Sequence, residues 1–91
     1  MFVEVLNYPK QPSVDARKRH QDFLRAHGNE GRLYVAGKFN DESGGLVIWK
    51  VESMQTAEKL AKEDPYSKEG FATFVLKEWS LGFDYSGVQS K

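Results

Sequence analysis

The 91-residue chain contains no cysteine, and this absence excludes two classes of protein. A disulfide-stapled scaffold and a metal site built on thiolates both require cysteine. An excess of charge is also missing, because 13 basic side chains balance 13 acidic ones. A neutral chain lacks the basic surface that attracts proteins to nucleic acid or to anionic membranes, so we expect neither partner.

Long apolar runs are absent as well, and no segment approaches the roughly 20 residues that span a membrane. The opening MFVEVLNY has neither the basic start nor the long apolar core of a signal peptide, so we expect a cytoplasmic protein. A chain of this length buries roughly 64 % of its unfolded surface, which is enough for one thin core. We expect one domain over residues 1–80 and a C-terminal extension over residues 81–91, whose last six residues are small and polar.

The apolar periodicity predicts four strands and two helices. We expect the strands at residues 2–8, 33–39, 46–51 and 71–79. Ser13 and Ser53 can cap the two helices, Gly28 ends the first, and the Asp64-Pro65 step ends the second. A turn over residues 40–45 joins the second and third strands. The order βαββαβ predicts a ferredoxin-like α+β fold, a four-stranded antiparallel sheet with two helices on one face.

The face of the sheet opposite the helices has no cover in this arrangement. We expect it to display some of a set that comprises Phe2, Leu6, Tyr34, Trp49 and the aromatic positions of the last strand, and we expect Trp79 to pack in the core. An apolar patch of this size on so small a protein predicts a homodimer that buries it.

His20 shares a helix face with Ala16, Phe23 and Leu24, where an imidazole needs a hydrogen-bond partner. It is either a buried structural histidine or an acid–base group. His27 lies about 10 Å further along the helix, so the two cannot share a metal ion without other ligands, and no metal site is expected. His27 is expected to interact with the helix C-terminus as a cation.

Asp64 has two interpretations that the residues alone leave open. It can cap a new helical turn that begins with Pro65, or its carboxylate can orient the imidazole of His20.

Four other residues are candidates for binding a small molecule. Arg17, one turn before His20, can contact an anion or belong to a solvated helix face. Tyr8 and Tyr66 can line a pocket or simply pack. Ser43, with the two glycines that follow it, can offer backbone N–H groups to an anion or form a hairpin turn.

Several segments, taken in order, resemble the YCII-related domain family over residues 2–79. They are FVEVLNY, RKRHQDFLRAHGNEGRLYVAGKF, GGLVIW, AKEDPY and KEW. The most specific elements are His20 followed by Phe23-Leu24, the segment GRLYVAG, and Asp64-Pro65-Tyr66. The chain departs from the family pattern at FNDES and in its ending LGFDY, so the resemblance does not extend to a substrate class.

The resemblance implies a ferredoxin-like dimer, related in fold to dimeric α+β barrel proteins such as muconolactone isomerases. It also implies an active site formed by His20 and Asp64, and a dehydrochlorinase of a chlorinated hydroxyquinol shows that the fold can support elimination. The leading hypothesis is a small cofactor-independent enzyme that moves a proton in an elimination or isomerisation. The alternative is a dimeric module that binds a small molecule or a partner without chemistry.

Overall fold

The computed structural model describes residues 1–87. Residues 88–91, the end of the expected extension, lie outside the described part. The chain forms seven elements, which are β1 (Phe2–Asn7), α1 (Val14–Asn29), β2 (Leu33–Lys38), β3 (Gly44–Trp49), α2 (Met54–Glu63), α3 (Pro65–Lys68) and β4 (Thr73–Glu78). The expected βαββαβ order is confirmed, with the short helix α3 added after α2. Within residues 1–87, no helix has the length and apolar character needed to cross a bilayer.

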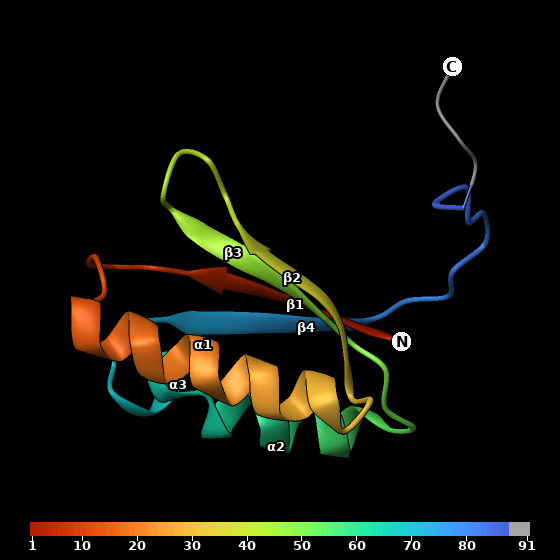
Figure 1. The fold of residues 1–91 in the computed structure, drawn as a ribbon, viewed down its shortest axis with the longest axis horizontal. Helices are drawn as coiled ribbons and strands as arrows, with labels where there is room; N and C mark the ends of the chain where they lie inside the picture. Colours follow the sequence, from red (N-terminus) through yellow and green to blue (C-terminus); the bar gives the residue numbers. More distant parts are fainter. Residues whose placement is uncertain (88–91) are drawn as a thin grey trace.

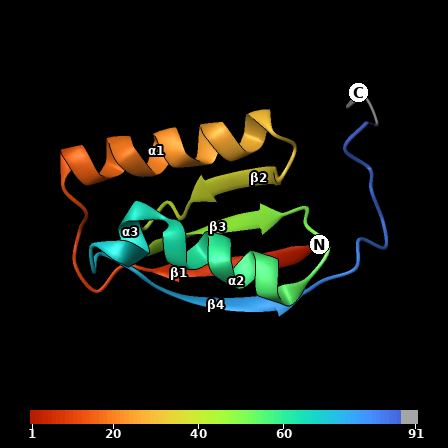
Figure 2. The same cartoon turned by 90° about the horizontal axis from the view of Figure 1, so that it is seen from below.

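The four strands form one antiparallel sheet in the order β2-β3-β1-β4. All three helices lie on one side of this sheet, as Figures 1 and 2 show from two directions. Helix α1 packs beside β2, and α2 packs over β4 and β1. This arrangement is the ferredoxin-like α+β fold that the sequence predicts.

The core lies between the sheet and the helices, and its largest side chain is Trp49. The strand register places Phe2, Trp49 and Leu6 on the helix side, where each is at most 4 % exposed. None of these three lies on the uncovered face, so for them the expectation is wrong. Alternation alone does not say which of two apolar faces the helices cover, and here they cover the face with the bulkier side chains.

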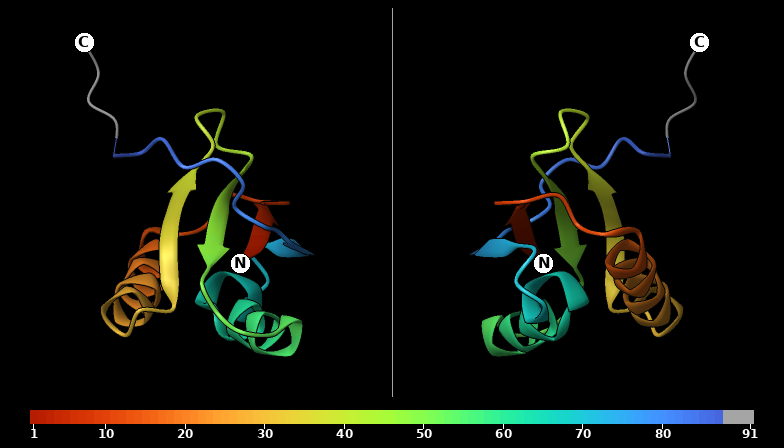
Figure 3. Two further views of the ribbon diagram at one scale, coloured as in Figure 1. Left: turned by 90° about the vertical axis from the view of Figure 1, so that its right-hand side faces the viewer. Right: turned by 90° about the vertical axis from the view of Figure 1, so that its left-hand side faces the viewer.

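The uncovered side of the sheet is aliphatic at its centre, and we call this side the open face. The register pairs Val3 with Ile48, and Val5 with both Leu46 and Val75. Val35 adjoins Ile48 from β2. Val5 is 39 % exposed and Val75 is 60 % exposed. Within residues 1–87, no helix packs against this face (Figure 3).

Two glycines let β3 begin earlier than the sequence predicts. A Cβ atom on Gly44 would lie 1.8 Å from the carbonyl oxygen of Leu6, and one on Gly45 would lie 2.7 Å from that of Gly37. Only glycine allows strands to approach this closely. Gly44 and Gly45 therefore belong to the sheet, and the turn is confined to the residues before them.

Candidate functional site

A buried histidine and a buried aspartate meet between α1 and the start of α3. Nδ1 of His20 lies 2.8 Å from Oδ1 of Asp64. The His20 residue is 8 % exposed and Asp64 is 0 % exposed. The two residues are 44 positions apart in sequence, so the fold alone brings them into contact. The expected hydrogen bond between them is confirmed.

The local sequence explains why Asp64 points at His20. Helix α2 ends at Glu63 because a residue before proline is pushed out of helical conformation, and Asp64 has φ −58° and ψ 128°. Oδ1 of Asp64 also accepts a hydrogen bond of 3.0 Å from the backbone N–H of Tyr66, which caps α3. The two interpretations left open by the sequence therefore both hold, since one oxygen caps the helix and holds the imidazole.

Aromatic rings hold the His20 imidazole in one orientation. The Tyr66 ring is stacked on it, with centroids 3.9 Å apart and planes 6° apart. Tyr8 packs edge-on against Tyr66 at 5.3 Å. Because Nδ1 is bonded to Asp64, Nε2 is the ring nitrogen left to act on a ligand. Within residues 1–87, no protein group forms a hydrogen bond with Nε2.

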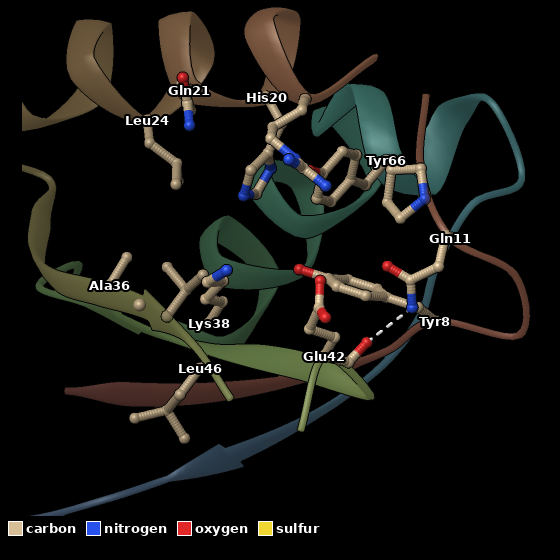
Figure 4. A pocket seen from close by; sticks show the side chains of 14 residues that line it. Tyr8, Gln11, His20, Gln21, Leu24, Ala36, Lys38, Glu42, Leu46 and Tyr66 are labelled. Atoms are coloured by element: carbon tan, nitrogen blue, oxygen red, sulfur yellow. Dashed lines mark hydrogen bonds between the residues drawn. The ribbon is translucent and has the colours of Figure 1, made fainter. Parts of the chain in front are cut away.

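His20 faces a cavity of about 250 Å³ that opens between α1, the β2–β3 hairpin and the loop after β1. Figure 4 shows His20 and Tyr66 on one side and Lys38 on the other. The structure thus brings together four of the residues that the sequence selects, and these are Tyr8, Arg17, His20 and Tyr66. The remaining lining residues are Gln11, Pro12, Gln21, Leu24, Ala36, Gly37, Lys38, Glu42, Leu46 and Val47.

Positive charge predominates around this cavity. It is lined by two permanent cations, Arg17 and Lys38, and by one carboxylate, Glu42. Neither cation forms a salt bridge with a carboxylate of residues 1–87. Gln11 donates a hydrogen bond of 2.8 Å to the backbone carbonyl of Glu42 and so ties the hairpin to the loop after β1. Because neither cation is paired with a carboxylate of residues 1–87, Lys38 and Arg17 can bind an anion that enters the cavity.

The two tyrosine hydroxyls of the cavity stay protonated at any physiological pH. Burial raises the pKa of Tyr8 to about 12, and the nearby Tyr66 and Asp64 add to the effect. Burial also raises the pKa of Tyr66, although the adjacent Arg17 guanidinium acts in the opposite direction. Both hydroxyls can therefore donate hydrogen bonds to a ligand.

Ser43 lies outside the set of residues that line the cavity. Its backbone N–H and its hydroxyl both donate to Oδ1 of Asp41, at 3.0 and 2.6 Å. Its carbonyl oxygen accepts a bond of 2.8 Å from the N–H of Tyr8. Ser43 thus shapes the hairpin and anchors Tyr8, and the structure does not bring its side chain to the other candidates.

His27 has a different hydrogen-bond partner from His20. Nε of Arg32 donates a hydrogen bond of 2.8 Å to Nδ1 of His27. Burial lowers the pKa of His27, and the Arg32 cation lowers it further. His27 is therefore a neutral acceptor, and the expectation of a cationic interaction with the helix terminus is wrong.

Glu4 is a buried ionisable residue that the sequence alone does not mark as a site residue. It is 0 % exposed, and Nε1 of Trp49 donates a bond of 2.8 Å to its Oε1. Burial raises its pKa to about 7; the Trp49 hydrogen bond opposes this shift and the Asp64 charge adds to it. Its Oε2, like Oδ2 of Asp64, has no hydrogen-bond partner within residues 1–87. The sequence feature that points to Glu4 is its position on the same strand face as the apolar residues Phe2 and Leu6.

No group of three or more histidine, aspartate or glutamate side chains within residues 1–87 is arranged to hold a metal ion.

Comparison with known proteins gives three findings. The model of the YCII-related domain family matches residues 1–80. The uncharacterized protein YjpA of Bacillus subtilis (strain 168) is 32 % identical over 62 residues, which cover 68 % of this chain and 73 % of YjpA. Among solved structures, the fold is similar to 5-chloro-2-hydroxyhydroquinone dehydrochlorinase (TftG) from Burkholderia phenoliruptrix AC1100, with a TM-score of 0.72 and 19 % identity. That match covers 90 % of this chain and 96 % of the other, which was solved in complex with 2,5-dihydroxybenzoquinone.

Proposed function

The chain belongs to the YCII-related domain family, and from the geometry of its buried pair we propose that it is a small cofactor-independent enzyme in which His20 transfers a proton on a small organic substrate. The observation that carries this proposal is the 2.8 Å contact between Nδ1 of His20 and Oδ1 of Asp64 beside a cavity. This is how a catalytic histidine is held in one tautomer with its other nitrogen free.

In the proposed reaction, Nε2 of His20 removes a proton from a carbon next to an activating group. The electron pair of that C–H bond then forms a double bond and expels a leaving group, which is elimination. Alternatively, the proton returns at another carbon, which is isomerisation. Asp64 keeps Nδ1 protonated and stabilises the imidazolium that forms. The cavity lining contains no cysteine, serine or threonine, so no thiol or alcohol nucleophile is part of the proposal.

The size and charge of the cavity favour a small anionic substrate. A volume of about 250 Å³ suits a compound of one ring or a short chain. Arg17 and Lys38 favour a carboxylate or a phenolate, and the hydroxyls of Tyr8 and Tyr66 can bind its oxygens. The fold neighbour was solved with a quinone of one ring, which is compatible with a ligand of this size.

The decisive experiment measures proton exchange directly. The protein is incubated in D₂O with 2,5-dihydroxybenzoquinone and with pairs of small carboxylates and their amides, and deuterium in the recovered compounds is measured by mass spectrometry. We expect exchange next to the activating group for acids but not for their amides. Binding without exchange, at equal levels in His20→Gln and wild type, would favour the non-catalytic binding module. Absence of both binding and exchange would contradict both functions.

We also propose that the protein works as a homodimer. Support comes from the open face, where Val5 and Val75 remain 39 % and 60 % exposed. A face of this kind is costly to leave in water on a small monomer. Light scattering at micromolar concentration should give twice the 10.4 kDa of one chain, and a mass of one chain would refute the dimer.

A further inference from the structure

The segment after β4 carries apolar side chains that stay outside the core. We call residues 79–85 the C-terminal arm. Its exposed fractions are 37 % for Trp79, 39 % for Leu81, 85 % for Phe83 and 72 % for Tyr85. The expectation that Trp79 packs in the core is therefore wrong. Phe83 and Tyr85 are the aromatic residues most exposed within residues 1–87.

The apolar residues of the arm occupy every second position. In an extended chain, residues two apart point to the same side. When the arm is extended, one side is aromatic and aliphatic, and the other carries Ser80, Gly82 and Asp84. This is the pattern of a segment that buries one side against another surface.

The body of its own chain covers only the first part of the arm, because Trp79 and Leu81 are more than half covered whereas Phe83 and Tyr85 are not. Beyond Trp79, whose N–H donates to the carbonyl of Met1 at 2.8 Å, no hydrogen bond within residues 1–87 ties the arm to the sheet or the helices. Figures 1 and 3 show that the arm leaves the end of β4 and extends on the side of the sheet away from the helices. The open face is on that same side.

We propose that the C-terminal arm of one copy lies across the open face of a second copy, so that two copies clasp each other. The proposal rests on the homodimer proposed above and identifies the segment that holds it together. Apolar side chains of the arm match the aliphatic open face in character. The formal net charge of zero means that two identical copies approach without long-range repulsion.

The area of the arm is in the range that a stable dimer needs. A standard interface buries about 800 Å² on each partner. An aromatic side chain buries roughly 150–250 Å², so Phe83 and Tyr85 supply roughly half of that area. In a two-fold symmetric dimer both arms make the same contact, which doubles the gain.

The first test compares two kinds of exposed apolar residue. Phe83→Ser with Tyr85→Ser removes the most exposed part of the arm, and Val14→Ser changes a valine that is 80 % exposed on α1, on the helix side of the sheet. Sedimentation equilibrium should show the dissociation constant rising at least 10-fold for the arm variant and unchanged for the control. If the arm variant dimerises like wild type, the arm proposal is wrong while the dimer stands. If wild type is a monomer, both proposals fail.

A second measurement locates the arm even if dimer strength changes little. Because the chain has no cysteine, Gly82→Cys provides a single attachment site for a spin label, and a Cβ there meets no atom within 4 Å. Spin-labelled chain is mixed with ¹⁵N-labelled chain that carries no label. We expect paramagnetic broadening at the amides of Val35 and Val75 in the ¹⁵N chain. Absence of broadening in this mixture, with broadening of the same amides in a chain that carries both ¹⁵N and the spin label, would show that the arm folds back on its own sheet and would overturn the proposal.

Discussion

Both faces of the sheet carry mostly apolar residues, but they differ in one respect. One face encloses buried polar groups, and the other leaves apolar side chains exposed. The face under the helices is closely packed and surrounds polar groups, among them Glu4 at 0 % exposure and the adjoining His20–Asp64 pair. The open face is aliphatic around Val5 and Val75, which remain exposed, and Lys77 lies beside Val3 at one end of it. A buried polar group and an exposed apolar face are each unfavourable on an isolated chain. The covered face is therefore the place to expect chemistry, and the open face the place to expect association.

The largest effect should come from the covered face. His20→Ala or His20→Gln removes the proposed base and should lower the rate of proton exchange by 10²- to 10⁴-fold. His27→Ala, on the same helix, should leave the rate within about twofold, because His27 is a neutral acceptor for Arg32. Deuterium incorporation measures the rate, and circular dichroism checks that both variants fold. Equal exchange rates for the His20 and His27 variants would contradict the assignment of His20 as the base.

Asp64→Asn separates the two tasks of this residue. An asparagine oxygen can still cap α3, so the thermal midpoint should change little. The imidazole loses the charge that stabilises its protonated form, and the exchange rate should fall about 10²-fold or more. Rate and thermal midpoint are measured on the same sample. A large loss of stability with an unchanged rate would mean that Asp64 serves only as a helix cap.

Glu4 tests the covered face through pH. Its pKa is raised to about 7 in the folded protein, against an ordinary value of 4.5. Between these values the unfolded chain has lost the proton and the folded chain retains it, so stability falls as pH rises and levels off above pH 7. The loss is about 3 kcal/mol, from 1.36 kcal/mol for each pKa unit.

Glu4→Gln should remove that loss. Urea unfolding from pH 4 to pH 9 should show the stability of wild type falling relative to the variant as pH rises. A buried amide has its own unpaired hydrogens, so the difference at any one pH is less informative than its change with pH. A difference that stays constant over this range would show that Glu4 does not titrate there.

The open face should respond to charge with a smaller effect. Val75→Lys places an ammonium on the surface proposed to be buried between two copies, and the dissociation constant should rise about 10-fold, or 1.4 kcal/mol. Val14→Lys makes the same change at an exposed valine on α1 and should leave association unchanged. Sedimentation equilibrium measures both. An equal response of the two variants would indicate that the open face is not the interface.

Much of the fold follows from local sequence. Period-two runs of β-branched and aromatic residues give the strands, and the caps Ser13 and Ser53 begin the helices as predicted, each accepting a hydrogen bond of 3.1 Å from a backbone N–H. The observed ends of some strands differ from the predicted ends by one or two residues, because contacts between distant segments decide where these strands end. Gly44 joined β3 because it approaches Leu6, a contact between segments 38 positions apart that no local pattern contains.

The candidate site was predictable in part. His20 was visible as an ionisable residue on an apolar helix face, and Asp64 as a residue before proline with two possible tasks. Glu4 was overlooked because a single carboxylate in an apolar strand can face either side of the sheet. Lys38 was overlooked because only the pairing of β2 with β3 and its position opposite α1 bring it to the cavity.

The amino-acid sequence by itself determined the order of helices and strands, the absence of thiol chemistry and the balance of charge. These depend on neighbouring residues and on composition, so they can be read from short segments. Only the tertiary structure decided which sheet face the helices cover, that one oxygen of Asp64 both caps α3 and holds His20, and that Phe83 and Tyr85 after β4 stay uncovered. The physical reason is that burial and hydrogen-bond partners depend on distances between segments far apart in the chain, and those distances exist only once the layers pack.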